Sequence, residues 1–319
     1  MARFQYASPD RGTGTSQEWP DFNVQYLWVD LGPEDRDRVE EYIQKLYHAH
    51  PAALESVLAG SRRRAMIFGD GDALVMVLAH IDHPLPDLTL HPLSVFLGAH
   101  FLVTVHTKDP DSTVEPAWQH VARGGLLKHG PDRALYQLLL SHWERLNDLD
   151  HEISERIEKL NVDVLRHPLR DLTSNILHMR HALVTMRKLL RPEVDIYDLL
   201  RDRDLKQISD STRPFFAQLA NRVQALYDEM EARIEGLSGS VEAYSSMQSN
   251  EINKVMRFLT VLSVLALPAT TIASIYGMNF KIPELQWPWG YWYSLALMLV
   301  ITVLMLVALH RRSGMERKD

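Results

Sequence analysis

The chain has 319 residues, of which 46 % are hydrophobic and 24 % charged, a composition that excludes wholesale disorder. Its formal net charge of −7 argues against nucleic acid as a partner, because nucleic-acid binding needs a basic surface. Cysteine is absent, which excludes disulfide bonds and thiolate metal sites.

The first half of the chain predicts a short tail followed by an α/β domain. Residues 1–20 are polar, rich in Gly, Ser and Thr, and lack the apolar run of a signal peptide, so we expect a disordered tail. Residues 21–130 begin with a strand over 23–31, and helices are expected over 33–48 and 51–60. Apolar runs bounded by turn residues predict further strands over 65–68, 73–81, 93–97 and 101–106.

Two apolar seams at helical spacing follow and predict a helical hairpin over residues 131–211. The first seam covers 135–164 and ends before Pro168. The second covers 172–190 and is expected to end at Pro192, because proline interrupts a helix interior.

A long stalk helix is expected over residues 212–257, starting near Pro214, where proline is tolerated in a first turn. Its seam indicates self-association in a bundle, and the absence of proline before Pro268 predicts that the helix continues into the membrane. The stalk also carries an acidic face. This face either attracts cations to a membrane entrance or is a solvated helix face, and its members are Asp228, Glu235 and Glu242.

Two uncharged apolar runs, 258–276 and 291–309, are each long enough to cross a bilayer. Lys254 and Arg257 precede the first run, and a basic tail over 310–319 follows the second. Positive flanks face the cytoplasm, so both termini and the α/β domain are expected there, with 277–290 as an extracytoplasmic loop. The sequence therefore predicts a multi-pass protein of the cell inner membrane, with the lipid bilayer as a partner.

The first run differs from the second in carrying a polar stripe. Residues at spacings of three and four place small hydroxyls and apolar side chains on one helical face. Such a stripe either lines a pore or holds neighbouring helices together. Its members are Asn253, Met256, Thr260, Ser263, Leu267, Thr270, Ser274 and Gly277.

Fifteen histidines are present, and most are expected to be scattered surface residues. The best metal-ligating group is His80, Asp82 and His83, which follows a predicted strand. No histidine spacing matches hydrolytic chemistry, and no nucleophile–base pair or phosphate-binding loop is present. We therefore expect neither an enzyme nor a resident cofactor.

Gly277, Met278 and Asn279 lie between the two runs, after NKVMRFLT at 253–260 and before Pro-Glu-Leu at 283–285. In this context the sequence resembles the CorA-type family of divalent metal ion (magnesium/cobalt) transporters. Weaker likenesses, such as LWVDL at 27–31 and LVTVH at 102–106, extend the resemblance over most of the chain.

The resemblance implies a homopentameric helical channel: an α/β cytoplasmic domain, a long stalk helix and two transmembrane helices. It implies transport of Mg²⁺, and also Co²⁺ and Ni²⁺, through a selectivity filter at Gly277, Met278 and Asn279. Glu284 in the outer loop would attract cations. The implied pore-lining residues are Asn253, Met256, Leu259, Ser263, Leu267 and Thr270.

The chain departs from the family at Ser56 and Gln218, where two acids that bind regulatory Mg²⁺ are typical. We therefore do not expect a regulatory site there. The zinc-transporting branch of the family, with proton-coupled transport, stays an alternative for the ion. A membrane-anchored oligomeric scaffold is the alternative from another functional class.

Overall fold

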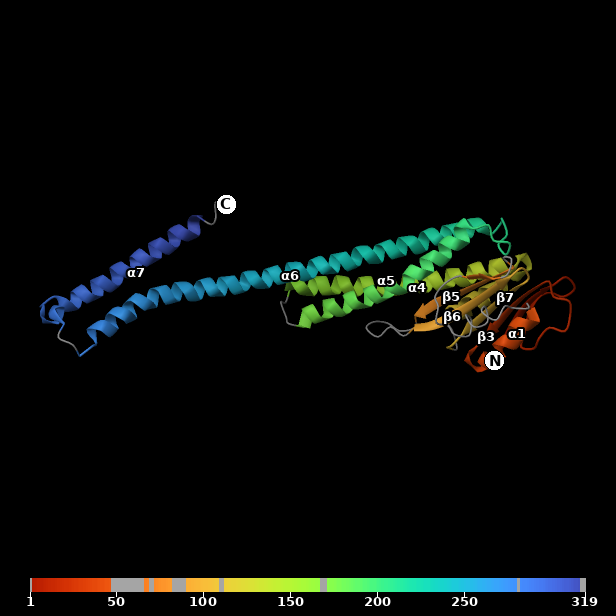
Figure 1. Cartoon of the computed structure of the whole chain (residues 1–319), viewed down its shortest axis with the longest axis horizontal. Helices are drawn as coiled ribbons and strands as arrows, with labels where there is room; N and C mark the ends of the chain where they lie inside the picture. Colours follow the sequence, from red (N-terminus) through yellow and green to blue (C-terminus); the bar gives the residue numbers. More distant parts are fainter. Residues whose placement is uncertain are drawn as a thin grey trace. The chain divides into compact units, whose positions relative to one another are not determined.

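The computed structural model describes residues 2–46, 66–68, 72–81, 90–108, 112–166, 171–279 and 282–315. The chain divides into two compact units, Met1–Val241 and Glu242–Asp319. Helix α6 (Arg213–Tyr276) begins in the first unit and ends in the second (Figure 1). Its bounds confirm the prediction of one helix continuing from the stalk into the first span.

The first unit contains a seven-stranded sheet in the order β2-β1-β3-β7-β6-β5-β4. Neighbouring strands are antiparallel except β3 and β7, which pair in parallel. The strands are β1 (Arg3–Ser8), β2 (Gly12–Ser16), β3 (Tyr26–Leu31), β4 (Met66–Phe68), β5 (Ala73–Ile81), β6 (Leu90–Gly98) and β7 (Phe101–His106). Five of them match the strands predicted between residues 23 and 106.

The expected disordered tail at residues 1–20 is wrong, because β1 and β2 form one side of this sheet. Side chains alternate along β1 as they must in a strand buried on both faces. Phe4 is 1 % exposed and lies edge-on to Trp19 and Tyr42. On the other face, the Gln5 amide donates to the carbonyl of Trp118 at 2.7 Å.

An ion pair also holds β1 in place. Arg3 Nε donates to Asp30 Oδ2 at 2.7 Å, and its Nη1 reaches Glu115 at 2.5 Å. Burial raises the pKa of Asp30, but the hydrogen bond and charge of His106, together with Arg3 and Thr104, hold that pKa below its ordinary value. The ionised carboxylate of Asp30 is therefore stabilised by partners inside the domain. Through these partners it links β1 to β3, β7 and α3.

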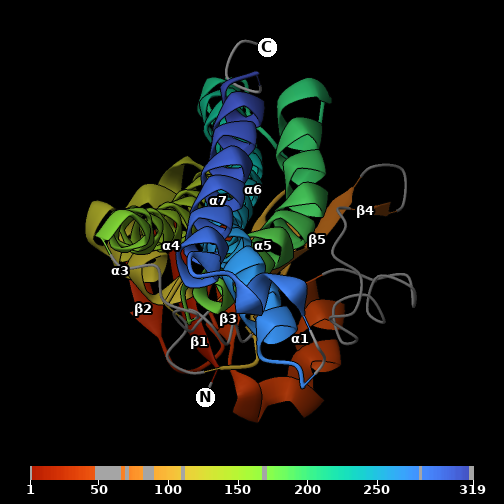
Figure 2. The ribbon, with the colours of Figure 1, turned by 90° about the vertical axis from the view of Figure 1, so that its left-hand side faces the viewer.

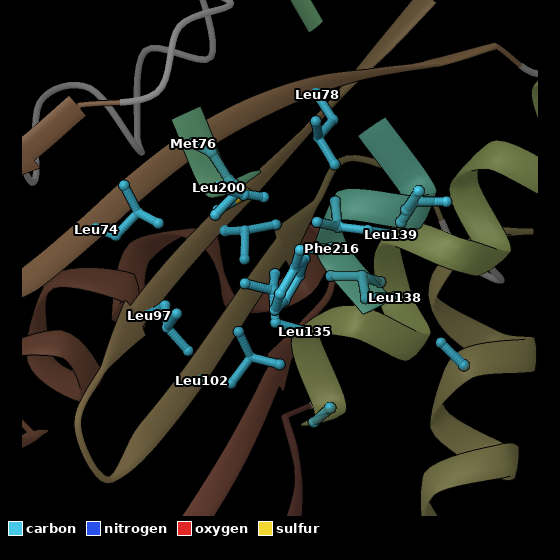
Figure 3. Close-up of a cluster of buried hydrophobic side chains, with 14 of the residues drawn as sticks. Leu74, Met76, Leu78, Leu97, Leu102, Leu135, Leu138, Leu139, Leu200 and Phe216 are labelled. Carbon is cyan, nitrogen blue, oxygen red and sulfur yellow. The ribbon is translucent and has the colours of Figure 1, made fainter. Parts of the chain in front are cut away.

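Helices cover both faces of the sheet. On one face lie η1 (Pro33–Arg38) and α1 (Val39–Leu46), packed on Val29, Val75 and Val103. On the other face lie α3 (Val114–Gly124), η2 (Leu126–His129), α4 (Pro131–Arg166), the end of α5 (Asp171–Asp202) and the start of α6. Figure 3 shows this second core, in which Leu138 of α4 and Phe216 of α6 meet the leucines of the strands.

Helix α5 does not end at Pro192 as predicted but continues ten residues further to Asp202. Proline removes one backbone hydrogen bond and costs about 3 kcal/mol in a helix interior. The last turns compensate by burying Val194, Ile196, Tyr197 and Leu200 against the sheet side of the core. Glu193 adds a hydrogen bond, since its Oε1 accepts the backbone N–H of Ala79 at 2.6 Å.

Helices α4 and α5 form the predicted hairpin and lie alongside the first half of α6 (Figure 1). Leu183 and Met186 of α5 and Met230 of α6 are fully buried in their common core. Arg233 of α6 is also paired with the buried carboxylate of Asp150 on α4. The helix predicted over 51–60 lies outside the described residues.

We predict that Leu138→Ala destabilises the first unit by about 2–5 kcal/mol, because it leaves a cavity in a closely packed core. Leu177→Ala, in a side chain that is 47 % exposed on α5, should change stability by no more than about 0.5 kcal/mol. Urea unfolding of the full chain in detergent, followed by tryptophan fluorescence, measures both. Equal midpoints for the two variants would contradict this assignment of the core.

Candidate ion-conduction pathway

The second unit contains the end of α6, the short helix η3 (Pro283–Gln286) and α7 (Gly290–Met315). Within the described residues, α6 and α7 are the two helices long and apolar enough to cross a membrane. They contain the predicted spans 258–276 and 291–309. Both spans are long and apolar enough to cross a membrane, so what distinguishes them is the distribution of their polar side chains.

One face of α6 is covered within the single chain. Pro268 is buried and Ile272 is 8 % exposed, while Leu265, Ala269 and Tyr276 are partly covered. A stripe of partly covered residues also runs along α7 at spacings of one, three and four: Ser294, Leu297, Met298, Ile301 and Thr302. Both stripes are therefore covered by other parts of the second unit.

The predicted pore stripe lies on the opposite face of α6. Nine residues separate Ser263 from Ile272, so the two side chains leave the helix axis about 180° apart. Met256 is 57 % exposed and Leu267 is 60 % exposed. All members of the stripe are exposed in the single chain: Asn253, Met256, Leu259, Thr260, Ser263, Leu267, Thr270, Ser274 and Gly277.

The threonine hydroxyls of this span are bonded to their own helix. Thr260 Oγ1 donates to the Met256 carbonyl at 2.8 Å, and Thr270 Oγ1 donates to the Ala266 carbonyl at 3.0 Å. Thr271 Oγ1 donates to the Leu267 carbonyl at 2.8 Å. Each hydroxyl proton is used in this way, so the oxygen presents lone pairs rather than a donor to whatever passes the helix.

The Gly-Met-Asn segment follows the last turn of α6. The Gly277 N–H donates to the Ala273 carbonyl at 2.9 Å, and the Met278 N–H to the Ile275 carbonyl at 3.2 Å. A Cβ on Gly277 would lie 3.1 Å from the Ala273 carbonyl, so glycine fits this turn with least crowding. Asn279 is exposed, and its amide makes no hydrogen bond to any residue that the structure describes.

The three predicted acidic residues of the stalk, Asp228, Glu235 and Glu242, are exposed on α6. Within the described chain none of them pairs with a cationic side chain, and Asp228 accepts only from Gln224 Nε2 at 2.7 Å. Their neighbours differ, since Glu229 pairs with Arg233 and Glu231 pairs with Arg187. The negative charge of these three residues is therefore not balanced by a cationic side chain in the part of the chain that the structure describes.

The other predicted residues are not brought together. Asp82 and His83 lie outside the described residues, as do Ser56 and the side chains of His80 and Glu284. The described part of the chain contains no group of three acidic or histidine side chains able to hold a metal ion. Gln218 is exposed on α6.

The sequence analysis did not identify the covered face of α6 at Pro268 and Ile272. This face matters because the side chains on the opposite side of the helix are the ones that stay exposed for contacts outside the single chain. The signal was readable, because Leu265, Pro268, Ile272 and Tyr276 recur at spacings of three and four. Choosing between Leu259 and Thr260 was harder. Both are exposed, and they lie on adjacent sides of the same face.

The sequence was compared with family models and curated proteins. The model of the CorA-like Mg²⁺ transporter protein family matches residues 23–311. The chain belongs to this family. A relative, the cobalt/magnesium transport protein CorA of Thermotoga maritima, is 28 % identical over 284 residues, which are 88 % of this chain and 81 % of the relative.

The fold was compared with solved structures. The complete structure of the CorA magnesium transporter from Methanocaldococcus jannaschii matches with a TM-score of 0.81 at 21 % identity, covering 98 % of each chain. The ZntB cytoplasmic domain from Vibrio parahaemolyticus matches with a TM-score of 0.61 at 14 % identity, covering 80 % of this chain and 98 % of that domain. The predicted combination of an α/β domain, a long helix and two spans is thereby confirmed.

Membership of a transporter family decides between the functional classes left open by the sequence. It confirms transport, agrees with the expectation that the chain is not an enzyme, and argues against the scaffold. Together with the two spans it also confirms an integral membrane protein with a cytoplasmic α/β domain.

Because the chain has no cysteine, a single introduced thiol can report which face of α6 meets water. We predict that Ser263→Cys in lipid vesicles reacts with a cationic, membrane-impermeant thiosulfonate and that the modified protein loses cation flux. The reagent needs the thiolate, which forms in water and not in hydrocarbon.

Leu299→Cys provides the matched control, because Leu299 is 67 % exposed in the single chain but has only apolar neighbours, Leu297, Met298, Val300 and Ile301, along α7. It should stay unmodified, and so should Ile272→Cys on the covered face. Equal modification at positions 263 and 299 would show that the stripe faces lipid.

Proposed function

We propose that five copies of the chain form a channel that moves Mg²⁺, and also Co²⁺ and Ni²⁺, across the cell membrane. The observation that carries this proposal is the uncovered stripe on α6, opposite the face at Pro268 and Ile272 that is covered within the single chain. One uncharged helix cannot enclose an aqueous path, so the stripe needs equivalent stripes from other copies. The number five comes from the family resemblance.

Asn279 forms the selectivity filter in this proposal, with Gly277 and Met278 holding it in position. Mg²⁺ dehydrates reluctantly and usually keeps several waters when bound. A ring of neutral amide oxygens accepts hydrogen bonds from those waters without holding the ion too tightly to release it. The free amide of Asn279 suits this role.

Apolar side chains on the same stripe provide the gate. Rings of Met256, Leu259 and Leu267 would exclude water when they close, and dewetting blocks a hydrated ion. Between them, the oxygens of Ser263 and Thr270 offer weak contacts to the water shell. Asn253 lies at the cytoplasmic end of the stripe.

Charge concentrates the ion at both ends of the pathway. The unbalanced carboxylates of Asp228, Glu235 and Glu242 would raise the local cation concentration along the stalk, and Glu284 would do so outside. Such attraction is screened by salt, since the stalk carboxylates are exposed. We propose no regulatory Mg²⁺ site at Ser56 and Gln218, because a hydroxyl and an amide gain little from a bound dication.

The ion is supported by the names of the relatives, which are cobalt/magnesium and magnesium transporters. Zinc transport, proton-coupled or not, is the competing outcome of the flux assay below.

We predict that Asn279→Ala lowers Mg²⁺ flux into proteoliposomes by at least about tenfold, since it removes one acceptor for the ion's water shell from each of the five subunits, and each hydrogen bond contributes about 0.5–1.5 kcal/mol. The control is Asn250→Ala, an exposed asparagine of α6 outside the stripe, which should leave flux unchanged. Flux of Mg²⁺, Co²⁺ and Zn²⁺ is measured with and without a pH gradient.

Two results would contradict the proposal. Wild-type flux in a correctly assembled Asn279→Ala variant would show that this ring is not the filter. A wild-type protein that moves Zn²⁺ but not Mg²⁺, and only along a pH gradient, would assign the chain to the zinc-transporting branch.

A further inference from the structure

A cavity of about 310 Å³ opens at one edge of the sheet in the first unit. Strands β1 and β2 form its floor through Gln5, Thr13 and Thr15, and α3 and η2 form its wall. Figure 2 shows β2 and α3 next to each other at this edge. Its volume lies at the lower end of the range for small-molecule sites.

The polar groups of the floor lie on one face of the sheet. Gln5 pairs with Thr15 across the strands, and Thr13 is two residues from Thr15, so the three side chains share that face. Gln5 is only 2 % exposed, and its amide nitrogen donates to the Trp118 carbonyl. Within the described residues nothing donates to its amide oxygen, and neither threonine hydroxyl is hydrogen-bonded. The floor therefore offers three polar groups with unused hydrogen-bonding capacity.

The wall contains an arginine, Arg123, that is not paired with an acidic side chain among the described residues. Arg123 is exposed, and among the described residues its guanidinium reaches only the amide oxygen of Gln119, at 3.3 Å. No carboxylate of the described residues pairs with Arg123 or with Lys128, five residues further on. On the same sheet Arg3 is paired with two acids, Asp30 and Glu115. The charge of Arg123 is therefore free for an external anion.

The rest of the wall is apolar and closely fitted. Val121 is 1 % exposed and Leu127 is 2 % exposed, and both line the cavity. Gly125 turns the chain between them with φ of 55°, a left-handed conformation suited to glycine. A Cβ at this position would lie 3.1 Å from Thr13 Oγ1, so the turn is held close to β2.

We propose that this cavity binds a small organic oxyanion, either a carboxylate or a phosphate ester. The planar guanidinium of Arg123 matches two oxygens of either group, and such charge-assisted hydrogen bonds are about twice as strong as neutral ones. The hydroxyls of Thr13 and Thr15 complete the contacts to the anionic group, and the carbon body lies against Val121 and Leu127. The ligand has the opposite charge to the transported ion, so this is a site separate from the transport function.

The test is isothermal titration of the full-length protein in detergent with succinate, 3-phosphoglycerate, glucose 6-phosphate and AMP. Inorganic phosphate and neutral glucose serve as reference probes. We expect at least one organic oxyanion to bind and Arg123→Gln to weaken it by about tenfold or more. Ala122→Phe, which fills the cavity without removing a polar group, should abolish binding. Arg36→Gln, an exposed arginine of η1, should bind as the wild type does.

The proposal is overturned if none of the four organic oxyanions binds at millimolar concentration, or if Arg123→Gln binds them as tightly as the wild type. Inorganic phosphate binding as tightly as the organic probes would also overturn it, because the apolar wall would then contribute nothing. Mg²⁺ flux is measured on the same variants and should stay at the wild-type level. A failure of this site is therefore distinguishable from a failure of the transport proposal.

Discussion

A divalent cation cannot enter hydrocarbon without oxygen atoms and water around it, and this constraint governs the membrane part of the molecule. No charged residue lies between positions 258 and 276, so the first span offers only neutral oxygens and apolar side chains. A single helix of this kind cannot shield the ion. Apart from Asn279, which follows the helix, the side chains proposed to do so as a ring lie on one face of α6, and the opposite face is covered within the single chain.

The two spans differ in composition in a way that fits different roles in the proposed channel. Helix α7 is almost wholly Leu, Val, Met and Ile in its membrane segment, which suits contact with lipid. Helix α6 combines small hydroxyls with large apolar residues and carries Pro268 on its covered side. Its own hydroxyl protons are used within the helix, as the bonds of Thr260 and Thr270 illustrate. The uncovered face is therefore polar enough to meet water and too weak a ligand set to trap an ion.

Local patterns in the sequence predicted the elements whose stability is local. The length of α6, both spans and the polar stripe follow from periodicity and from the positions of proline. The N-terminal strands were missed because β2 reads as Gly-Thr-Gly-Thr-Ser, a composition typical of a loop. What makes it a strand is its non-local pairing with β1, itself held by Arg3 and the buried Asp30. The prediction that α5 ends at Pro192 was wrong for a similar reason. The burial of Ile196 and Leu200 stabilises the helix beyond this residue and outweighs the local tendency of proline to end a helix.

For the candidate pathway, too, local patterns predicted some features, whereas others depend on tertiary contacts or on assembly. Periodicity placed Ser263 and Leu267 on one face, but it could not say which face of α6 is covered within the single chain, because that depends on tertiary contact. Whether Leu259 or Thr260 lies nearer a pore axis is a property of the assembly. The cavity at Arg123 had no signal in the sequence, since its floor and wall are more than a hundred residues apart.

Native mass spectrometry of the purified protein tests the central claim most directly, because every role assigned to α6 requires a closed ring of equivalent helices. The account predicts one dominant species with five times the mass of the 36.7 kDa chain. A dominant dimer or tetramer under conditions that preserve cation flux would contradict it.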